Sequence, residues 1–366
     1  MGKMRHRFQL RRAGSLLLCG ASLALCCYCA VRGLPVSLPD PLLAMLIPEE
    51  TAPAAQTDPE LFAAEGIVLD EMEQENPELT GGEDWGTFLL PSPTPAPFAE
   101  PRPAAAIDVA ALTVKGTASQ THQGTVYIKN STSAKIDAKT VLATDPGIKF
   151  AASGPRVLII HSHGSESYNV HGGAWYLTGD TSRDLDVSRN VVRVGDELAS
   201  ILNDAGIPCI HSTTMYDQPT YSTSYSSALK GLKSYLAKYP SVRVVIDLHR
   251  DALGGGGAVK YKVVSRIGEE TCAQLMFVMG TNVCGLSHPN WRKNLAFAAR
   301  VQQAVLAKYP TLMRPITMSK NRYNQHVTPG SCILEVGTDG NTQEEALAAI
   351  RHFGPVLAEV LKSMGA

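Results

Sequence analysis

Three short stretches of the sequence carry residues that bind metal ions or move protons. The first is "HSHGSES" (161–167), the second is "DLHRDA" (247–252), and the third is "ILEVG" (333–337). Each stretch lies at the end of an apolar run, where a buried strand is expected to finish. A hydrolytic zinc ion needs two or three imidazole or carboxylate ligands, one open position for water and a carboxylate base nearby. The three stretches together contain such a set.

A zinc site can be assembled from these stretches with one residue left to act as the base. His163 and Glu166 form an H-x-x-E pair that supplies two ligands from one loop, and His249 supplies a third from a distant strand end. Glu335 follows apolar residues, whose burial raises the pKa of a carboxyl group towards that of a useful general base. A single strand-end histidine is more often structural, but two on one sheet with a carboxylate on a third strand favour a metal site.

Two neighbouring side chains are expected to support this site. Side chains alternate along a strand, so His161 shares a face with His163 and is either the ligand itself or a group behind it. By the same alternation Asp247 shares a face with His249 and can orient its imidazole ring. The residues alone leave open which of the first two histidines binds the metal.

The residues between these stretches predict an alternation of strands and helices. Apolar runs predict strands within 124–130, 155–163, 242–249, 274–282 and 331–338, and helical patterns predict helices over 188–206, 291–308 and 343–362. Ser188 is a candidate cap and Gly206 a candidate stop for the first helix, and the Gly354-Pro355 pair should kink the last. The alternation predicts an α/β fold with a mixed, mostly parallel sheet flanked by helices. In such sheets the chemistry collects at the carboxyl ends of the strands.

Charge divides the chain of 366 residues into three regions, although its totals of 33 basic and 34 acidic residues nearly balance. Residues 1–34 hold six Lys and Arg and no acidic residue, whereas residues 35–107 hold fourteen acidic residues and one basic residue. Residues 108–366 then carry 26 basic and 20 acidic residues, a net charge of about +6. Three charge characters indicate three different physical roles.

The first two regions predict an anchor and a spacer. Within 1–34, a basic stretch precedes the mostly apolar residues 13–31, which is typical of a transmembrane signal-anchor with the rest of the chain outside the cytoplasm. A cleaved signal peptide is the alternative. The Pro-, Ala- and Glu-rich segment 35–107 predicts a disordered linker that gives the folded part reach. A small β-rich lead-in is predicted over 108–150, and a catalytic domain over 151–366.

The eight cysteines do not point to a thiolate metal site. Four lie in the apolar N-terminal stretch, and the other four are scattered without a CxxC pair: Cys209, Cys272, Cys284 and Cys332. Outside the cytoplasm two disulfides are conceivable, and small buried side chains are the alternative.

Several longer blocks of the sequence are similar to one known family. They occur in the right order over residues 110–362 and closely resemble the stage II sporulation protein P family: "VLIIHSHGSESY", "NVVRVGDELASIL", "IDLHRDA", "FVMGTN" and "NRYNQHVTPGSCILEVGTDGNTQEEA". That family is similar in turn to the zinc-dependent N-acetylmuramoyl-L-alanine amidases. The resemblance implies that His163 and His249 match metal-binding positions. It also implies that Glu335, followed by Asn341 as in E-V-G-x-x-x-N, matches the catalytic glutamate.

One part of the ligand set stays open. The broader amidases take a zinc-binding Glu from just before the first long helix, where this sequence reads "TSRDLDVSRN", with Asp186 but no Glu. Either Glu166 or Asp186 is therefore the third ligand, and the H-x-x-E spacing favours Glu166. Arg250 or His326 is the predicted second donor to the oxyanion of the reaction.

The resemblance also implies an activity and a setting. The activity is Zn²⁺-dependent hydrolysis of the amide between N-acetylmuramic acid and L-alanine in peptidoglycan, during septal wall remodelling and engulfment in sporulation. The setting is a single-pass membrane protein at the septum with an extracytoplasmic catalytic domain, beside a membrane-bound lytic transglycosylase and a multispanning membrane partner. Two alternatives are a zinc carboxypeptidase acting on wall peptides and a non-catalytic envelope scaffold on an amidase-like fold. Nothing in the sequence indicates a nucleic-acid partner.

Overall fold

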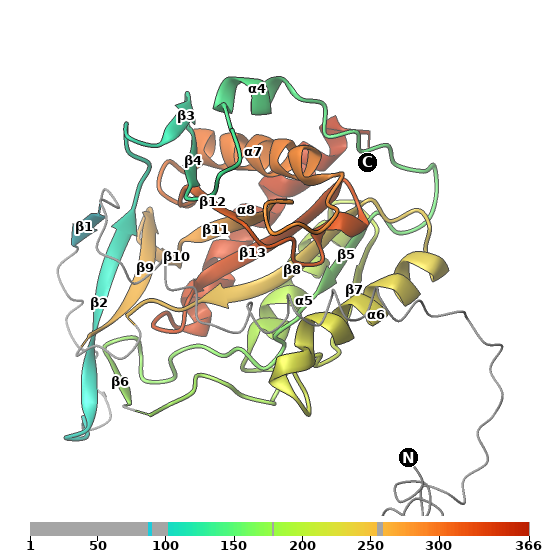
Figure 1. Ribbon diagram of the computed structural model, residues 1–366. Coiled ribbons are helices and arrows are strands. Elements are labelled where there is room, and N and C mark those ends of the chain that lie inside the picture. The colour runs from blue at the N-terminus through green and yellow to red at the C-terminus, as the bar shows by residue number, and fades with distance from the viewer. Residues whose placement is uncertain (1–86, 90–101, 178, 255–258, 366) are drawn as a thin grey trace, which may run out of the picture. The chain divides into compact units, whose positions relative to one another are not determined.

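The computed structural model describes residues 87–89, 102–177, 179–254 and 259–365 (Figure 1). The predicted signal-anchor and nearly all of the predicted linker lie outside these residues. Among the helices described, none combines the length and the apolar character that crossing a membrane requires.

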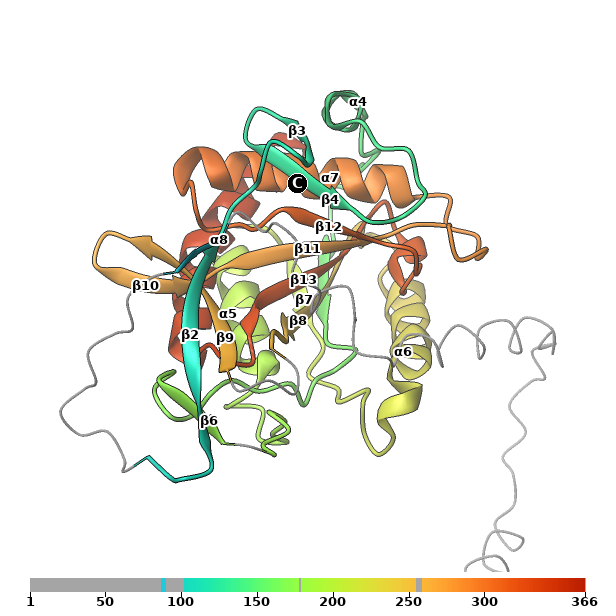
Figure 2. The same cartoon turned by 60° about the vertical axis from the view of Figure 1, so that its left-hand side comes forward.

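The centre of the fold is an eight-stranded sheet (Figures 1 and 2). Its strands lie in the order β3 (Thr121–Gln123), β4 (Val126–Asn130), β12 (Ile316–Ser319), β11 (Leu275–Gly280), β13 (Gly330–Thr338), β8 (Val244–Asp251), β5 (Val157–Ile160) and β7 (Cys209–His211). Within this described sheet β3–β4 and β11–β13 pair antiparallel, and the other pairs are parallel. The prediction of a mixed, mostly parallel sheet is therefore confirmed.

Helices cover both faces of this sheet (Figure 2). Three of them pack on one face and form the main apolar core with β5, β8, β11 and β13: α5 (Val191–Asp204), α7 (Trp291–Lys308) and α8 (Gln343–Ser363). On the opposite face α6 (Ser224–Lys238) packs against Leu158, Ile160 and Val245. The short helix α4 (Ala138–Ala143) lies next to α7.

The sheet face covered by α6 also carries Asp247, His249 and Glu335. On β8, Val245 packs against α6, and alternation puts Asp247 and His249 on the same side. On β13 the direct cross-strand partners of Asp247 and His249 are Ile333 and Glu335. The register of two parallel strands therefore sets Glu335 beside His249.

A second sheet joins segments that lie far apart in the sequence. Its strands pair in the order β1 (Thr87–Leu89), β2 (Ala106–Val114), β9 (Val259–Ile267) and β10 (Glu270–Ala273), and β6 (Trp175–Leu177) pairs with β2. The predicted lead-in, 108–150, is divided between the sheets, because β2 joins the second sheet while β3 and β4 join the first.

The helices near the site begin and end close to their predicted limits. α5 is capped by Asn190, whose side chain accepts a hydrogen bond from the Val192 N–H, rather than by Ser188. Gly206 follows its end with a φ of +80°, a conformation that favours glycine. α8 continues through Pro355 to Ser363, and the kink predicted at the Gly354-Pro355 pair stays a prediction. The four described cysteines are free, and none forms a disulfide.

Candidate metal centre

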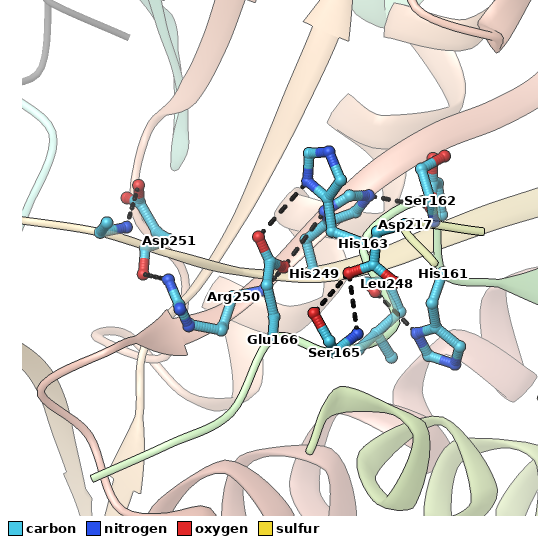
Figure 3. Close-up of polar contacts among 12 residues, drawn as sticks. His161, Ser162, His163, Ser165, Glu166, Asp217, Leu248, His249, Arg250 and Asp251 are labelled. Carbon is cyan, nitrogen blue, oxygen red and sulfur yellow. Dashed lines mark hydrogen bonds and ion pairs between the residues drawn. The ribbon is translucent and has the colours of Figure 1, made fainter. Parts of the chain in front are cut away.

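His163, Glu166 and His249 come together at the carboxyl ends of β5 and β8 (Figure 3). The Nδ1 atom of His163 lies 3.4 Å from Oε1 of Glu166, and the Nδ1 atom of His249 lies 3.3 Å from Oε2 of the same carboxylate. One candidate ligand atom from each residue lies within 4.8 Å of those of the other two. The structure thus brings the H-x-x-E pair and the distant histidine into one group.

The turn after β5 holds the H-x-x-E pair in position. The Glu166 N–H donates to the His163 carbonyl at 3.2 Å, and the Glu166 carbonyl accepts from the Val191 N–H at 2.9 Å. The backbone N–H of Arg250 donates to Oε2 of Glu166 at 3.2 Å. The Ser165 hydroxyl donates to buried Asp217 at 2.5 Å. Main-chain bonds from the start of α5 and from β8 therefore fix the carboxylate between the two imidazoles.

The charges of the group favour a bound cation. Burial by itself would raise the pKa of Glu166, but His249 and His163 hold it well below its ordinary value. Burial by itself would lower the pKa of His249, but Asp247 and Glu166 raise it well above its ordinary value. The ionised carboxylates of Glu166 and Asp247 are stabilised by positive charge on the neighbouring imidazoles. A bound divalent ion can provide that positive charge in place of an imidazole proton.

The donor set fits zinc. Two imidazole nitrogens and a carboxylate, with one position left for water, are the ligands of many hydrolytic zinc sites. Asp247 supports the set from behind, since its Oδ1 lies 2.9 Å from Nε2 of His249. Asp247 is itself held by the Ser162 N–H at 2.8 Å and the Ser162 hydroxyl at 2.5 Å. Such a carboxylate–histidine pair orients a metal ligand and raises its basicity. The prediction that Asp247 and His249 lie on the same face of the strand is confirmed.

Asp186, the alternative third ligand, lies away from this group. Its carboxylate accepts hydrogen bonds from the N–H and hydroxyl of Ser188 and lies 3.3 Å from Arg189. Its side chain is 46% exposed, whereas that of Glu166 is 8% exposed. The structure therefore brings Glu166, and not Asp186, to the two histidines, because Asp186 is used within its own turn.

Glu335 has the properties of a general base. It is partly buried, and its Oε2 is buried without a hydrogen-bond partner among the described residues. Burial, followed by the nearby charge of Asp251, raises the pKa of Glu335 to about 8. A carboxyl group with a pKa near neutrality can both take up a proton and return it within one turnover.

His161 points away from the metal group, so the prediction that it shares a face with His163 is wrong. β5 ends at Ile160, and strand alternation no longer applies beyond that residue. Its Nδ1 pairs with the Leu248 carbonyl at 2.8 Å, and its Nε2 lies 2.7 Å from Nε2 of His211. His161 therefore belongs to the packing between β5, β7 and α5.

The guanidinium of Arg250, one of the two predicted oxyanion donors, is used by backbone carbonyls, and the role of His326, the other one, stays a prediction. The guanidinium of Arg250 is buried, and it donates to the carbonyls of Ser167 and Ser182, each at 2.9 Å, and of Asp251 at 3.4 Å. His326 lies in the short turn η3 (Gln325–Val327) before β13, whereas Glu335 lies in the second half of that strand. Burial, with Arg322 and Lys233 nearby, lowers the pKa of His326 to about 4.

Two tyrosines contact the candidate ligand His163. Tyr221 stacks on the His163 ring with 4.6 Å between centroids, and Tyr225 meets that ring edge-on at 5.1 Å. Tyr225 also lies nearly parallel to the His249 ring at 6.3 Å. The aromatic pair in "TYSTSY" (220–225) just before a helical pattern is the only local signal for them.

Asn341, singled out with Glu335 by the resemblance, has a structural task here. Its Oδ1 accepts from the N–H groups of Thr338 at 2.9 Å and Val263 at 3.1 Å, and its Nδ2 donates to the Val263 carbonyl at 3.1 Å. These bonds tie the end of β13, and with it the Glu335 strand, to β9.

A second group of candidate ligands lies where β10 meets α8, and it consists of Glu270, Cys272 and His352. The imidazole of His352 already pairs with Glu270 at 2.7 Å. Burial, with Glu270 and Glu345 nearby, raises the pKa of the Cys272 thiol to about 12. A neutral thiol is a poor ligand because the thiolate is the form that binds metals, so we assign the metal centre to the first group.

Solved structures of two amidases are similar to this chain. The N-acetylmuramoyl-L-alanine amidase AmiC2 of Nostoc punctiforme is 15% identical, with a TM-score of 0.35, over 59% of this chain and 100% of that chain. The CwlD amidase from Clostridioides difficile, solved in complex with the GerS lipoprotein, is 13% identical, with a TM-score of 0.34, over 58% and 98% of the two chains.

The sequence comparisons identify the family. The stage II sporulation protein P of Bacillus subtilis (strain 168) is 27% identical over 218 residues, which are 56% of this chain and 50% of that protein. The chain thus spans about half the length of this curated relative. The family model for stage II sporulation protein P matches residues 102–362, which are most of the chain and include the whole metal centre. The protein therefore belongs to the stage II sporulation protein P family.

Proposed function

We propose that the protein is a zinc-dependent N-acetylmuramoyl-L-alanine amidase. The observation that carries the proposal is the group of His163, Glu166 and His249 with Glu335 beside it on the same face of the sheet. Membership of a sporulation family supports a role in the sporulating cell. The scissile bond is the amide between the lactyl group of N-acetylmuramic acid and the amine of L-alanine.

The residues divide the work of hydrolysis between them. His163, Glu166 and His249 would hold a zinc ion, which would supply a Lewis acid for the amide carbonyl and would lower the pKa of water to about 7. Glu335 accepts the proton of the attacking water as the carbon–oxygen bond forms. Glu335 then returns this proton to the nitrogen of L-alanine as the carbon–nitrogen bond breaks. Asp247 keeps the His249 ring in the orientation that binding requires.

The proposal includes a setting for the enzyme. Apolar residues 13–31 anchor the chain in the membrane, and the acidic linker carries the catalytic domain to the wall. The net charge of about +6 over residues 108–366 suits a substrate whose peptide stems bear free carboxylates. At the sporulation septum the protein works with a lytic transglycosylase and a multispanning membrane partner.

Digestion of purified sacculi tests this function. The products are separated and identified by mass, with and without a chelator. We expect peptide stems with a free L-alanine amine and intact glycan strands, and we expect the chelator to abolish their release. Release of single C-terminal residues would instead indicate a carboxypeptidase, and bound zinc without any product would indicate a scaffold.

A further inference from the structure

Hydrolysis of an amide places negative charge on the carbonyl oxygen, and a second donor besides the metal is usually aimed at that charge. Two arginines near the centre, Arg250 and Arg183, have their contacts elsewhere. Arg250 donates to three carbonyls, and Arg183 pairs with Asp217 at 3.3 Å while lying over the Tyr221 ring. Arg314 is fully buried and donates to Asp251 at 2.8 Å through Nη2, while its Nε and Nη1 have no hydrogen-bond partner among the described residues. A neutral group that lies against the candidate ligands could supply the second donor without a buried charge.

Tyr225 is such a group. It lies in the first turn of α6, which packs on the sheet face that carries His249 and Glu335. Its ring contacts both histidine ligands, at 5.1 Å from His163 and 6.3 Å from His249. Its hydroxyl makes no hydrogen bond to the residues that the structure describes, and it lies within the electrostatic reach of Asp247, Glu335 and Glu166. The side chain is partly buried.

The loop before β13 holds Tyr225 in this place. The Asn324 side chain donates to the Tyr225 carbonyl at 2.9 Å, and the Tyr323 ring lies 5.7 Å from the Tyr225 ring. Tyr323 has a φ of +49°, a strained conformation for a residue with a side chain. The loop also passes so close to β11 that a Cβ on Gly280 would lie 2.5 Å from the Asn321 carbonyl oxygen. Strained backbone conformations such as that of Tyr323 are found most often at functional sites.

We propose that the Tyr225 hydroxyl donates a hydrogen bond to the carbonyl oxygen of the scissile amide as negative charge develops on it. This inference rests on the amidase function proposed above. A phenol with an ordinary pKa of about 10 is protonated at neutral pH and donates without giving up its proton. Proton transfer remains with Glu335, so the two residues have separate tasks. Tyr225 takes the place that the sequence analysis predicted for Arg250 or His326.

The Tyr225→Phe variant tests the hydroxyl alone, because phenylalanine keeps the ring contacts with both histidines. We expect kcat for stem release to fall by about 10²–10³-fold, as on removal of one oxyanion donor. We expect KM and zinc content to stay close to those of the wild-type protein, since neither depends on the hydroxyl. The matched control is Tyr235→Phe, which makes the same change farther along α6, where Tyr235 packs against the apolar cluster under that helix. This control should release stems at the wild-type rate.

A second measurement does not depend on turnover. A phosphinate replaces the scissile amide of a muramoyl-L-alanine compound and mimics the tetrahedral oxyanion. Its affinity for Tyr225→Phe, measured by calorimetry, should fall by a factor similar to that in kcat, because analogues of the transition state report the same interactions. The affinity of a substrate fragment with a planar amide should not change.

The outcomes separate this inference from the function on which it rests. Stem release by the wild-type protein with an unchanged kcat in Tyr225→Phe would overturn the inference and leave the amidase function standing. A loss of zinc or a lower melting temperature in Tyr225→Phe would assign the hydroxyl a structural role and also overturn it. If the wild-type protein released no stems, the proposed function and this inference would fall together. A fall in kcat with equal loss of phosphinate affinity, zinc being retained, supports it.

Discussion

Glu335 of β13 and His249 of β8 are direct cross-strand partners, with their side chains on the same face of the sheet. A shift of one residue in this register would turn Glu335 towards the main core between the sheet and the helices. The hydrogen-bonded ladder of the two strands therefore sets the distance between the proposed base and the metal ligands. Because each side chain is positioned by its own strand, substitutions of the two residues should have separable effects.

Removal of a ligand should remove the metal. The purified protein should carry about one zinc ion per chain, and His163→Ala or His249→Ala should lose it, since two remaining protein ligands bind zinc far more weakly. Asp186→Ala is the control, because Asp186 is exposed and bonded within its own turn. Elemental analysis after dialysis measures the zinc. Full zinc content in both histidine variants, or its loss in Asp186→Ala, would contradict the ligand set.

Glu335→Gln should separate binding from chemistry. The amide keeps the shape of the side chain but cannot take up the proton, so turnover on sacculi should fall by about 10²–10⁴-fold. Zinc content should be unchanged because Glu335 lies outside the ligand group. Stability should not fall either, since no ion-pair partner of Glu335 is present among the described residues to be left uncompensated. A zinc-loaded variant that works at the wild-type rate would refute the assignment of the base.

The raised pKa of Glu335 predicts how stability depends on pH in the metal-free protein. The folded protein keeps the proton up to a pKa of about 8, whereas the unfolded chain loses it near the ordinary pKa of about 4.3. The folded state thus binds more protons between these values, and this group's contribution to the free energy of unfolding falls as pH rises through that window.

The comparison of wild type with Glu335→Gln isolates this contribution. Denaturant unfolding in the presence of a chelator, from about pH 5 to about pH 8, should show the wild type losing stability relative to the variant. Glu269→Gln, an exposed change on the hairpin between β9 and β10, serves as the control and should follow the wild type. If the free energy of unfolding changed with pH in the same way for the wild type and Glu335→Gln, the pKa of the Glu335 carboxyl would not be raised by burial.

Gly195→Ala should destabilise the fold through His161. A Cβ at Gly195 of α5 would lie 2.7 Å from Nε2 of His161 and 2.6 Å from Nε2 of His211, where the two rings meet under the helix. We expect a loss of about 1–3 kcal/mol, as for other overpacked sites. Ser200→Ala, an exposed change on the same helix, should leave the melting temperature nearly unchanged. Equal melting temperatures for all three proteins would show that the two histidines move apart without cost.

The sequence carries strong local signals for part of the fold. The apolar runs at β5, β8, β11 and β13 and the helical pattern at α7 are long enough to be identified from periodicity. β12 has only four residues, and α6 mixes its few leucines with serine and lysine, so neither stands out from its surroundings. The pairing of β2 with β9 joins segments about 150 residues apart, which no local pattern can reveal.

The sequence alone could have excluded Arg250 as an oxyanion donor. Alternation along β8 places Arg250 on the opposite face from His249, so strand periodicity already argues against it as an oxyanion donor. For the choice between Glu166 and Asp186 the sequence offered only the H-x-x-E spacing, which favours Glu166. The choice depended on the path of the loop from β5 to α5, which returns Glu166 to the Arg250 N–H and leaves Asp186 outside.

The sequence already contains the residues of the proposed chemistry, because His163, Glu166, His249 and Glu335 follow apolar runs that are expected to become buried strands. Which groups lie together in the site depends on the tertiary structure. Distances between side chains on different elements depend on strand register, on loop paths and on helix packing. Strand register, loop paths and helix packing bring the Arg250 guanidinium to backbone carbonyls and turn His161 towards α5. They also bring the Tyr225 ring against His163 and His249. They arise from contacts between segments far apart in the chain, and no single stretch of sequence contains them.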